Sequence, residues 1–392
     1  ALMLASHGVE VIGTDYNPEL VTTLNSGKTT FKEKGLDELF ANALKGGIKF
    51  SNEYQKTDTY IVSVPTPYDK FSKIIDPCYV IEAVKSVLKV ANKGATLVIE
   101  STVSPGTIDK FVKPIIKEAG FKIGEDINLV HAPERIIPGN MVYELLHNNR
   151  TIGADDREIG EQVKKLYSSF CEGQIVVTDI RTAEMTKVVE NTFRAVNIAF
   201  ANELVKICEK ADLNVYEVIK ICNMHPRVNI LQPGPGVGGH CISVDPWFLV
   251  GDYPQLTKVI GASMLINDSM PEYVLSRAYK IMKERGITDF SRVGVYGLTY
   301  KENVDDYRES PALQLLAHQE EHLGMPLKSF DPWVSKDIVN NQYHDFDAFL
   351  KDVDFVIVTV KHSHIIENQD KLKDKVVFDT VNVLSGDNVY KY

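Results

Sequence analysis

The chain has 392 residues, with 43 Lys and Arg against 53 Asp and Glu and a formal net charge of −10. At roughly 100–200 residues per domain, this length predicts two or three domains, each with its own core. The acidic balance argues against a surface for nucleic acid or for an anionic membrane. A small anionic substrate stays compatible with it, because a few basic side chains can be concentrated in one cleft.

The cysteines favour a reducing compartment. There are five, an odd number, and none forms a CxxC pair: Cys78, Cys171, Cys208, Cys222 and Cys241. This pattern favours free thiols over a disulfide framework or a zinc site, so we expect no metal. No apolar run approaches the roughly 20 residues that span a bilayer, and the sequence opens without a basic leader. We therefore expect a cytoplasmic protein.

The first half of the chain alternates short β-rich runs with helical stretches, which is the pattern of an α/β domain. A helix is expected over 79–91, where Val80, Val84 and Val87 recur at helical spacing. The expected strands are 9–14, 48–51, 59–64, 96–100, 128–131 and 175–178.

The first expected strand leads into Asp15. In a dinucleotide-binding βαβ unit, an acid at this point takes the ribose hydroxyls of NAD and repels the 2′-phosphate of NADP. The glycine-rich turn GxGxxG should precede the helix before this strand, but the sequence begins at Ala1, inside that predicted helix. We expect the first strand and its turn to be missing from this sequence. Taken alone, Asp15 fits a solvated strand end better.

Two further segments follow expected strands, at the sheet edge where parallel sheets bind ligands. One contains Val64-Pro65-Thr66-Pro67, and the other runs from Glu100 through Thr102 to Thr107. The alternative is a pair of ordinary turns. Pro133-Glu134-Arg135 follows the strand that ends at His131, so Glu134 could provide a carboxylate near the same edge. The alternative is an exposed charge on a loop.

From Arg181 to Ala211 the chain contains no Gly or Pro. It predicts one helix of about 30 residues, near 45 Å long at ~1.5 Å per residue. Such a helix usually bridges domains or forms a dimer core, so we expect at least a homodimer. Lys187 and Asn191 are four residues apart and share a face. Together they could hold an alkoxide or oxyanion, although spacing alone favours a solvated face.

The most informative stretch is the glycine-rich segment 236–245, which includes Cys241 and Asp245. Glycines let backbone amides approach a ligand, and amides at the start of a following helix favour anions and activate a thiol. Cys241 comes shortly after Gly236, Gly238 and Gly239 and four residues before Asp245, so we interpret it as a nucleophile, which the neighbouring His240 could assist. A lone cysteine is otherwise most often a small buried hydrophobe, and we interpret the other four in that way.

From about residue 291 the α/β alternation restarts, with a helix over 311–323 and strands over 292–297, 327–330, 355–360 and 376–379. The predicted fold is α/β, with two Rossmann-like domains joined by a long central helix and a helical middle domain. We expect an NAD-binding domain over 1–180, a central dimerisation and catalytic domain over 181–288, and a C-terminal domain over 289–392.

These segments together resemble the UDP-glucose/GDP-mannose dehydrogenase family over nearly the whole chain. The likeness rests on the order and spacing of 64–67, 101–107, 133–135, 184–187 with Asn191, 236–245, and 297–301 with Asp306, Arg308, Glu309 and Ser310. Within the family, the segments 225–229 and 240–248 look most like the enzymes that act on UDP-N-acetyl-D-mannosamine. The enzymes acting on UDP-N-acetylglucosamine and UDP-glucose are similar alternatives.

The resemblance implies an NAD-dependent, four-electron oxidation of a sugar C6 hydroxyl to the uronate through a Cys241 thiohemiacetal and thioester. It implies that Lys187 and Asn191 stabilise oxyanions and that Asp245 or Glu134 orients water. The implied cofactor contacts are Asp15, Val64, Pro65, Thr102 and Arg308. The implied contacts to the UDP-sugar are Arg135, Arg227, Asn229, Gly236, Gly238, Gly239 and Lys301, with Arg227 reaching from a partner subunit.

Two other readings stay open. A β-hydroxyacid dehydrogenase also uses a Lys-x-x-x-Asn pair on a central helix, but it takes one NAD(P) and no thiol. The Gly-Gly-His-Cys loop and the C-terminal α/β domain argue against it. A non-catalytic nucleotide-sugar-binding protein would fit the absent glycine turn, but it would not need Cys241, Lys187 and Asn191 together.

Overall fold

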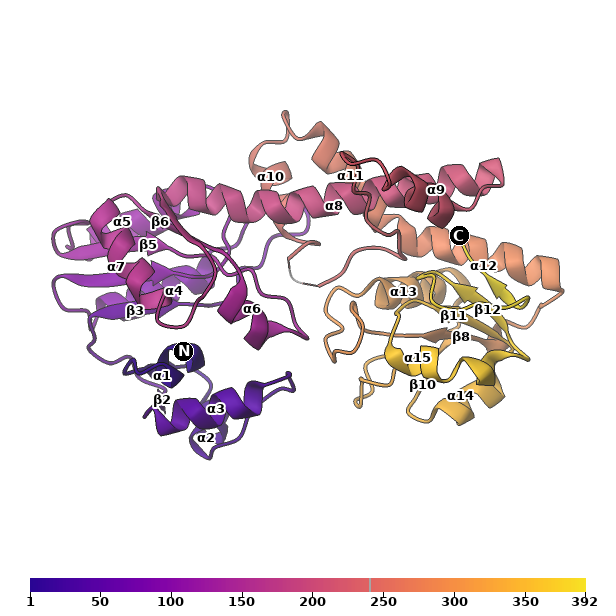
Figure 1. Cartoon of the computed structure of the whole chain (residues 1–392), viewed down its shortest axis with the longest axis horizontal. Helices are drawn as coiled ribbons and strands as arrows, with labels where there is room; N and C mark the ends of the chain where they lie inside the picture. The colour runs from indigo at the N-terminus through magenta and orange to yellow at the C-terminus, as the bar shows by residue number, and fades with distance from the viewer. Residues whose placement is uncertain (240) are drawn as a thin grey trace. The chain divides into compact units, whose positions relative to one another are not determined.

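A computed structural model describes residues 1–239 and 241–392. The chain forms two compact units, Ala1–Val189 and Glu190–Tyr392, and the boundary falls within the long helix α8, Ile180–Ala211. Figure 1 shows the first unit in indigo to magenta and the second in magenta to yellow. The prediction of a single helix over 181–211 is confirmed, because nothing in that segment interrupts helical hydrogen bonding.

The first unit contains two sheets flanked by helices. Its strands are β1 (Ile12–Thr14), β2 (Lys49–Ser51), β3 (Thr59–Val62), β4 (Ala95–Ile99), β5 (Ile127–His131), β6 (Arg150–Ala154) and β7 (Ile175–Thr178). Its helices are α1 (Leu2–Ser6), α2 (Pro18–Asn25), α3 (Leu36–Lys45), α4 (Cys78–Leu88), the π-helical η1 (Ile108–Val112), α5 (Lys113–Glu118), α6 (Met141–His147) and α7 (Arg157–Tyr167).

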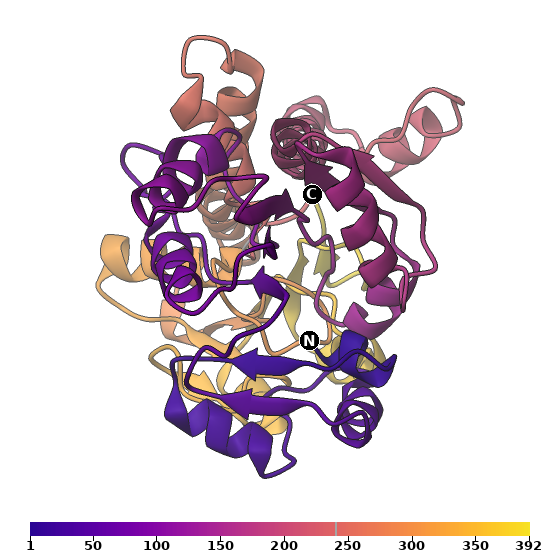
Figure 2. The same cartoon turned by 90° about the vertical axis from the view of Figure 1, so that its left-hand side faces the viewer.

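The strands of this unit fall into two ladders. β1 and β2 form a parallel pair, while β3-β4-β5-β6-β7 form a second sheet in which only the β5–β6 pairing is antiparallel. In Figure 2 the indigo pair is seen apart from the magenta strands. Leu4 of α1 packs with Val98 and Val130 of the second sheet in one buried cluster. Apolar packing therefore joins the two ladders, although β1 and β3 are not hydrogen-bonded to each other.

Strand β6 was not predicted. Its sequence, Arg150-Thr151-Ile152-Gly153-Ala154, has two β-branched residues but ends in Gly and Ala, which are depleted in strands. Gly153 has a packing reason, because a Cβ there would lie 2.6 Å from the Ala183 Cβ and 2.8 Å from the Ile180 Cα. The first turn of α8 therefore packs directly on this strand, as only glycine permits.

The second unit begins with helices and ends with one sheet. After α8 come α9 (Val215–Cys222), α10 (Asp245–Asp252), α11 (Lys258–Asp268) and α12 (Met270–Arg285). The strands are β8 (Val293–Tyr296), β9 (Lys328–Phe330), β10 (Gln342–Tyr343), β11 (Phe355–Val358), β12 (Val376–Asp379) and β13 (Val389–Tyr390). The remaining helices are η2 (Phe290–Arg292), α13 (Pro311–Leu323), α14 (Phe346–Asp352), α15 (Ser363–Glu367) and η3 (Gln369–Leu372).

The sheet of the second unit is entirely parallel, in the order β10-β9-β8-β11-β12-β13. In chain order this is 3-2-1-4-5-6, the order of a dinucleotide-binding fold. The strand order reverses between β8 and β11, and such a sheet binds ligands beyond the carboxyl ends of these strands. The predicted class, with two Rossmann-like domains and a long central helix, is confirmed.

No helix among residues 1–239 and 241–392 is both long and apolar enough to cross a membrane. Within the same ranges, no three His, Cys, Asp or Glu side chains are grouped as a metal site would require.

Candidate active site

Cys241 lies at the surface, in a turn just before α10. The backbone N–H groups of Val244 and Asp245 donate to the Cys241 carbonyl oxygen at 3.1 and 2.8 Å. The sequence suggested that amides at the start of the next helix would act on the thiol. The structure shows these two amides bonded to the carbonyl of the cysteine. The thiol itself is exposed, which a nucleophile requires and a buried small hydrophobe does not.

The glycines before Cys241 pack against a segment from the carboxyl end of β8. A Cβ on Gly238 would lie 2.7 Å from the Glu309 carbonyl oxygen, and one on Gly239 would lie 2.8 Å from the Tyr300 ring. Gly239 also has a positive φ of 86° and donates its N–H to the Arg308 carbonyl oxygen at 3.0 Å. These glycines therefore let two backbone segments meet beside the thiol. The sequence had indicated only that they would approach a ligand.

This same segment places charged side chains within electrostatic range of Cys241. The Arg308 guanidinium makes a bidentate ion pair with Asp306. Its Nε donates to Oδ1 at 2.8 Å and its Nη2 donates to Oδ2 at 2.5 Å. Hydrogen bonding to Asp306 raises the pKa of Arg308, and the charge of Cys241 contributes in the same direction. Burial raises the pKa of Tyr300 to about 12, aided by the charges of Asp306 and Cys241. Arg308 thus places a positive charge within electrostatic range of the sulfur.

Asn191 and Asp245 form a buried pair in the second unit. Asn191 Nδ2, on α8, donates to Asp245 Oδ2, on α10, at 2.6 Å. Asn191 is 7% exposed and Asp245 2%. One turn earlier on α8, Lys187 is 4% exposed. The alternative of a solvated helix face is therefore wrong for Lys187 and Asn191, because a solvated face would expose both side chains and both are buried.

A set of asparagines holds residues 231–234, just before the glycine-rich segment 236–245, and sequence reasoning missed this set. Asn197 Oδ1 accepts from the Leu231 N–H at 2.9 Å, and Asn202 Oδ1 accepts from the Gly234 N–H at 3.0 Å. Asn202 Nδ2 in turn donates to Asn267 at 3.0 Å. The available signal was the recurrence of asparagine inside an otherwise regular helix, where it has low helical propensity.

The predicted cofactor segments of the first unit meet as expected. Ser101 Oγ donates to the Val64 carbonyl oxygen and accepts from the Val64 N–H, both at 2.7 Å. The segments containing Pro65 and Thr102 are thereby held side by side, so they are more than two independent turns. Asp15 follows β1, and its Oδ1 accepts from the Asn17 N–H at 2.8 Å. A carboxylate has capacity for several donors, so Asp15 can still take ribose hydroxyls, and these residues fit NAD.

Glu184, which stood out in the sequence only as part of the segment 184–187, fixes the second of these segments to α8. Its two oxygens accept from the N–H groups of Gly106 and Ile108 at 2.7 and 2.9 Å. Burial raises the pKa of Glu184 to about 7, against the lowering effect of these hydrogen bonds. The carboxylate stands one turn before Lys187 and couples that helix to the 101–107 segment.

Glu134 is paired in the first unit. Its Oε2 lies 2.6 Å from the guanidinium of Arg150, and its Oε1 accepts from the Arg135 N–H at 2.8 Å. Arg150 is buried over the Tyr167 ring, with its guanidinium carbon 5.0 Å from the ring centroid. The guanidinium of Arg135 donates to the Asn149 carbonyl oxygen and to Thr151. Glu134 is therefore a fixed carboxylate, and the alternative of a mere loop charge is wrong.

The remaining predicted contacts lie in exposed or loop positions. Arg227 is exposed, and so is Asn229, whose carbonyl oxygen accepts from Asn197 Nδ2 at 2.8 Å. Lys301 follows β8, and its carbonyl oxygen accepts from the Thr299 hydroxyl at 2.9 Å. Gly236 packs on Pro311, with 3.1 Å between its notional Cβ and the proline Cβ. His240, which was expected to assist the thiol, lies outside the described residues.

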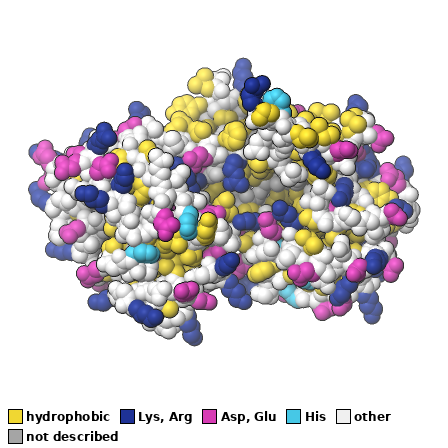
Figure 3. Space-filling model, in the orientation of Figure 1, with side chains coloured by type: hydrophobic (Ala, Val, Ile, Leu, Met, Phe, Trp, Pro, Cys, Tyr) yellow, Lys and Arg dark blue, Asp and Glu magenta, His cyan; other side chains and the backbone are white. Residues whose placement is uncertain are grey.

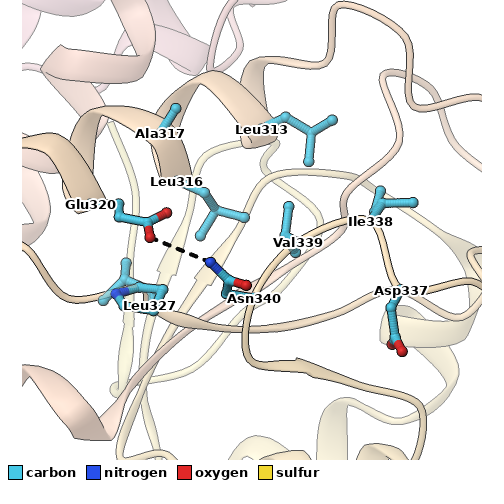
Figure 4. Close-up of a pocket in the computed structure, with 10 residues that line it drawn as sticks. Leu313, Leu316, Ala317, Glu320, Leu327, Asp337, Ile338, Val339 and Asn340 are labelled. Atoms are coloured by element: carbon cyan, nitrogen blue, oxygen red, sulfur yellow. Dashed lines mark hydrogen bonds between the residues drawn. The ribbon is translucent and has the colours of Figure 1, made fainter.

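Cavity size does not identify this site. One hollow of about 420 Å³ lies between α13 and the 337–340 segment, where Glu320 and Asn340 are hydrogen-bonded (Figure 4). Another, of about 510 Å³, lies beyond the carboxyl end of β9. Neither is lined by Cys241, Asn191 or Asp245. The chemistry of the side chains, rather than the volume, indicates the reactive position.

Comparison with known proteins gives the family. Residues 1–171 match the NAD binding domain of the UDP-glucose/GDP-mannose dehydrogenase family, residues 181–269 its central domain, and residues 294–386 its UDP binding domain. The chain belongs to this family. It is an NAD-dependent dehydrogenase with a UDP-binding C-terminal part. The resemblance found in the sequence is confirmed. A β-hydroxyacid dehydrogenase and a non-catalytic binding protein are both disfavoured.

Similar proteins carry related names. The chain is 39% identical to the UDP-N-acetyl-D-mannosamine dehydrogenase of Methanococcus vannielii, over 100% of this chain and 91% of that protein. It is 38% identical to the NDP-N-acetyl-D-galactosaminuronic acid dehydrogenase of Ralstonia nicotianae, over 99% and 94%. The native structure of the UDP-N-acetyl-mannosamine dehydrogenase of Staphylococcus aureus superposes with a TM-score of 0.89 at 42% identity, over 100% and 94%.

Proposed function

We propose that this dehydrogenase oxidises the C6 hydroxyl of UDP-N-acetyl-D-mannosamine to the carboxylate in two successive two-electron steps, with Cys241 as the covalent nucleophile. The observation that carries the proposal is the exposed Cys241 thiol, which is within electrostatic range of Arg308 and four residues before the buried Asp245. The similarity to enzymes named for this substrate supports the choice of sugar.

Bound NAD would supply the hydride acceptor for each oxidation. We propose that Asp15 holds its ribose, that Val64, Pro65 and Thr102 line its site, and that Arg308 contacts its pyrophosphate. The bond between Ser101 and Val64 supports this arrangement, because it fixes both segments at one sheet edge.

The chain's own part in the reaction begins once C6 is an aldehyde. The Cys241 sulfur adds to the aldehyde carbon, a C–S bond forms, and the carbonyl oxygen becomes an alkoxide. Lys187 and the Asn191 amide are proposed to stabilise that oxygen. Loss of a second hydride from the same carbon leaves a thioester. The adduct keeps the reactive aldehyde from escaping between the two oxidations.

Water then releases the product. Asp245 or Glu134 is proposed to orient the water and take its proton as it adds to the thioester carbon. The C–S bond breaks, the thiolate leaves with the bonding electrons, and the uronate remains. Asp245 accepts a hydrogen bond from Asn191, and Glu134 forms an ion pair with Arg150. Each carboxylate is therefore held in one orientation.

The contacts to the UDP-sugar are proposed from the family pattern. They are Arg135, Asn229, Lys301, the glycines Gly236, Gly238 and Gly239, and Arg227 of a second copy of the chain. The corresponding division is an NAD-binding part over 1–180, a central part over 181–288 and a UDP-sugar-binding part over 289–392. The exposure of Arg227 supports a contact across a subunit boundary.

We also propose a homodimer in the cytoplasm. Phe193, Phe200 and Ile207 of α8 are 66%, 49% and 56% exposed, and large apolar side chains so placed on one helix usually cover a partner. Figure 3 shows that hydrophobic side chains also gather at the top of the view, where Figure 1 places α10 and α11. An odd number of cysteines with no CxxC pair suits a reducing compartment.

The deciding experiment is an NADH assay on the full-length gene product. UDP-N-acetyl-D-mannosamine, UDP-N-acetylglucosamine, UDP-N-acetylgalactosamine and UDP-glucose are offered in parallel. We expect the highest kcat/KM with UDP-N-acetyl-D-mannosamine and two NADH formed per sugar consumed. A preference for another sugar would replace the proposed substrate, and one NADH per sugar would contradict the four-electron reaction.

A further inference from the structure

The C-terminal sheet contains a buried acid–histidine pair that none of the proposed chemistry uses. Asp331 follows β9 and His362 follows β11, the two strands that flank β8. His362 Nε2 lies 3.2 Å from Asp331 Oδ2, and both side chains are buried. Burying a polar pair costs free energy unless its donors and acceptors are hydrogen-bonded. The hydrogen-bond partners of this pair therefore show which part of the chain it fixes.

The partners of His362 fix its tautomer. The Asn303 N–H donates to Nδ1 at 2.9 Å, so that nitrogen carries a lone pair and the ring proton is on Nε2. Thr299 Oγ1 lies 3.3 Å from Nε2 and donates its own proton to the Lys301 carbonyl oxygen. The Nε2 proton therefore lies between Asp331 and the Thr299 hydroxyl, and one ring contacts both ends of the segment 299–303.

Asp331 holds the start of the same segment. Its Oδ2 accepts from the N–H groups of Leu298 and Thr299 at 2.6 and 3.1 Å, and its Oδ1 accepts from the Trp333 N–H at 2.8 Å. Burial alone would raise the pKa of Asp331, but His362 and the backbone donors hold it below the usual value. The carboxylate is thus an acceptor for four donors at the point where β8 ends.

The segment that this pair holds leads directly to the thiol. The Tyr300 N–H donates to the Asp306 carbonyl oxygen at 3.1 Å, which folds the segment back on itself. The Tyr300 ring covers Gly239, and the Arg308 carbonyl oxygen accepts from the Gly239 N–H. The Ser310 hydroxyl donates to the Thr299 carbonyl oxygen at 3.3 Å and closes the loop. A shift at Thr299 would therefore move Tyr300 and the loop that contains Cys241.

We propose that Asp331 and His362 are positioning residues, which fix the segment 298–303 and thereby place Lys301 for the UDP-sugar and Tyr300 and Arg308 beside Cys241. The proposal rests on the proposed function for the roles of Lys301 and Cys241. Neither member of the pair touches the reacting atoms. Their effect is transmitted through hydrogen bonds to the backbone of this segment and to the Thr299 hydroxyl, so it should alter the geometry of the site more than its chemistry.

The same sheet provides a matched control. Asp379, at the end of β12, is buried and accepts from the N–H groups of Val381, Val383 and Leu384 at 3.0, 2.7 and 2.7 Å. Asp331→Asn and Asp379→Asn make the same chemical change at two strand ends with similar hydrogen bonding. Asp379 holds the segment 381–384, which includes no residue of the proposed site. A general loss of stability should appear in both variants, and a positioning effect only in the first.

Two readouts distinguish positioning from stability in the full-length protein. The first is the rate at which iodoacetamide alkylates Cys241, measured by peptide mass spectrometry with and without UDP. The second is the pair kcat and KM for the UDP-sugar, measured at a temperature where each variant remains folded. We expect Asp331→Asn to change the alkylation rate and raise this KM by about tenfold, with weaker protection by UDP. Asp379→Asn should keep the alkylation rate, kcat and KM within about twofold of the parent.

Substitutions of His362 keep the proposal testable if Asp331→Asn fails to fold. The amide oxygen of His362→Asn can accept from the Asn303 N–H in place of Nδ1, whereas His362→Leu cannot. We expect His362→Asn to retain more substrate affinity than His362→Leu. Parent-like KM and alkylation in Asp331→Asn, or equal losses in Asp379→Asn, would overturn the proposal. If Cys241→Ala kept its activity, that result would refute only the proposed function. The alkylation rate of Cys241 would still report on how Asp331 and His362 position the segment.

Discussion

The amide of Asn191 donates to the carboxylate of Asp245 at 2.6 Å, and both side chains are buried. The Asp245 N–H in turn donates to the carbonyl oxygen of Cys241 at 2.8 Å. One residue therefore connects the long helix α8 to the backbone of the proposed nucleophile. An acid held in this way keeps one orientation, which suits a group that must direct water to a thioester.

Asp245→Asn should separate the charge of this acid from its packing. Two amides can still hydrogen-bond, as Asn202 and Asn267 do at 3.0 Å in the same unit, so we expect stability within about 1 kcal/mol of the parent. Loss of a general base should slow turnover by about 10²-fold and let the thioester accumulate. Rapid quench followed by intact-mass measurement would detect the acyl-enzyme. Parent-like kcat would exclude Asp245 from hydrolysis and leave Glu134 as the candidate.

Glu184 should make the stability of the first unit depend on pH. Its pKa is about 7 in the folded protein and near 4.5 when unfolded, so between these values the folded state binds more protons. Stability should therefore fall as pH rises from about 4.5 to 7, by at most about 3 kcal/mol. Thermal unfolding of the parent and of Glu184→Gln across this range would measure the effect. An equal pH dependence in both proteins would show that another group is responsible.

Gly239→Ala should disturb the loop that contains Cys241. The new methyl group would lie 2.8 Å from the Tyr300 ring on a residue with φ of 86°, so we expect a cost of about 1–3 kcal/mol and lower activity. Gly261→Ala is the matched control, because Gly261 lies inside α11 and no atom is within 4 Å of its notional Cβ. That change should stabilise the protein by about 0.5–1 kcal/mol. Chemical denaturation of both variants would test the pair, and an unaffected Gly239→Ala would contradict the close packing.

The apolar face of α8 should be the dimer contact. Phe200→Asp places a charge in the middle of this face, and we expect it to sediment as a monomer at micromolar concentration while the parent sediments as a dimer. Leu323→Asp is the control, because Leu323 is 45% exposed at the end of α13, outside this face. A monomeric parent, or a dimeric Phe200→Asp, would rule out this face.

The sequence predicted those features that depend on local chain properties. The helix over 181–211 follows from the absence of Gly and Pro, and the strands of the parallel sheets follow from buried β-branched runs. Cys241 stood out because it follows a cluster of glycines. These signals all lie within a few residues of the feature that they predict.

Other features depend on contacts between distant residues and had no such signal. Strand β6 ends in Gly and Ala and is fixed by packing of α8 on Gly153. The importance of Glu184 arises from amides nearly 80 residues away, since Gly106 and Glu184 are separated by 78 positions. The pair Asp331–His362 is likewise recognisable only after β9 and β11 lie on either side of β8. Single-sequence patterns do not contain such pairings.

The central claim is that one sulfur carries the sugar through the second oxidation. Its most direct test is the steady-state rate of uronate formation by full-length Cys241→Ala, with UDP binding measured on the same sample by calorimetry. The account predicts that UDP affinity stays within about threefold of the parent, while formation of uronate falls by at least about 10³-fold. Uronate formation at the parent rate by this variant would contradict the account.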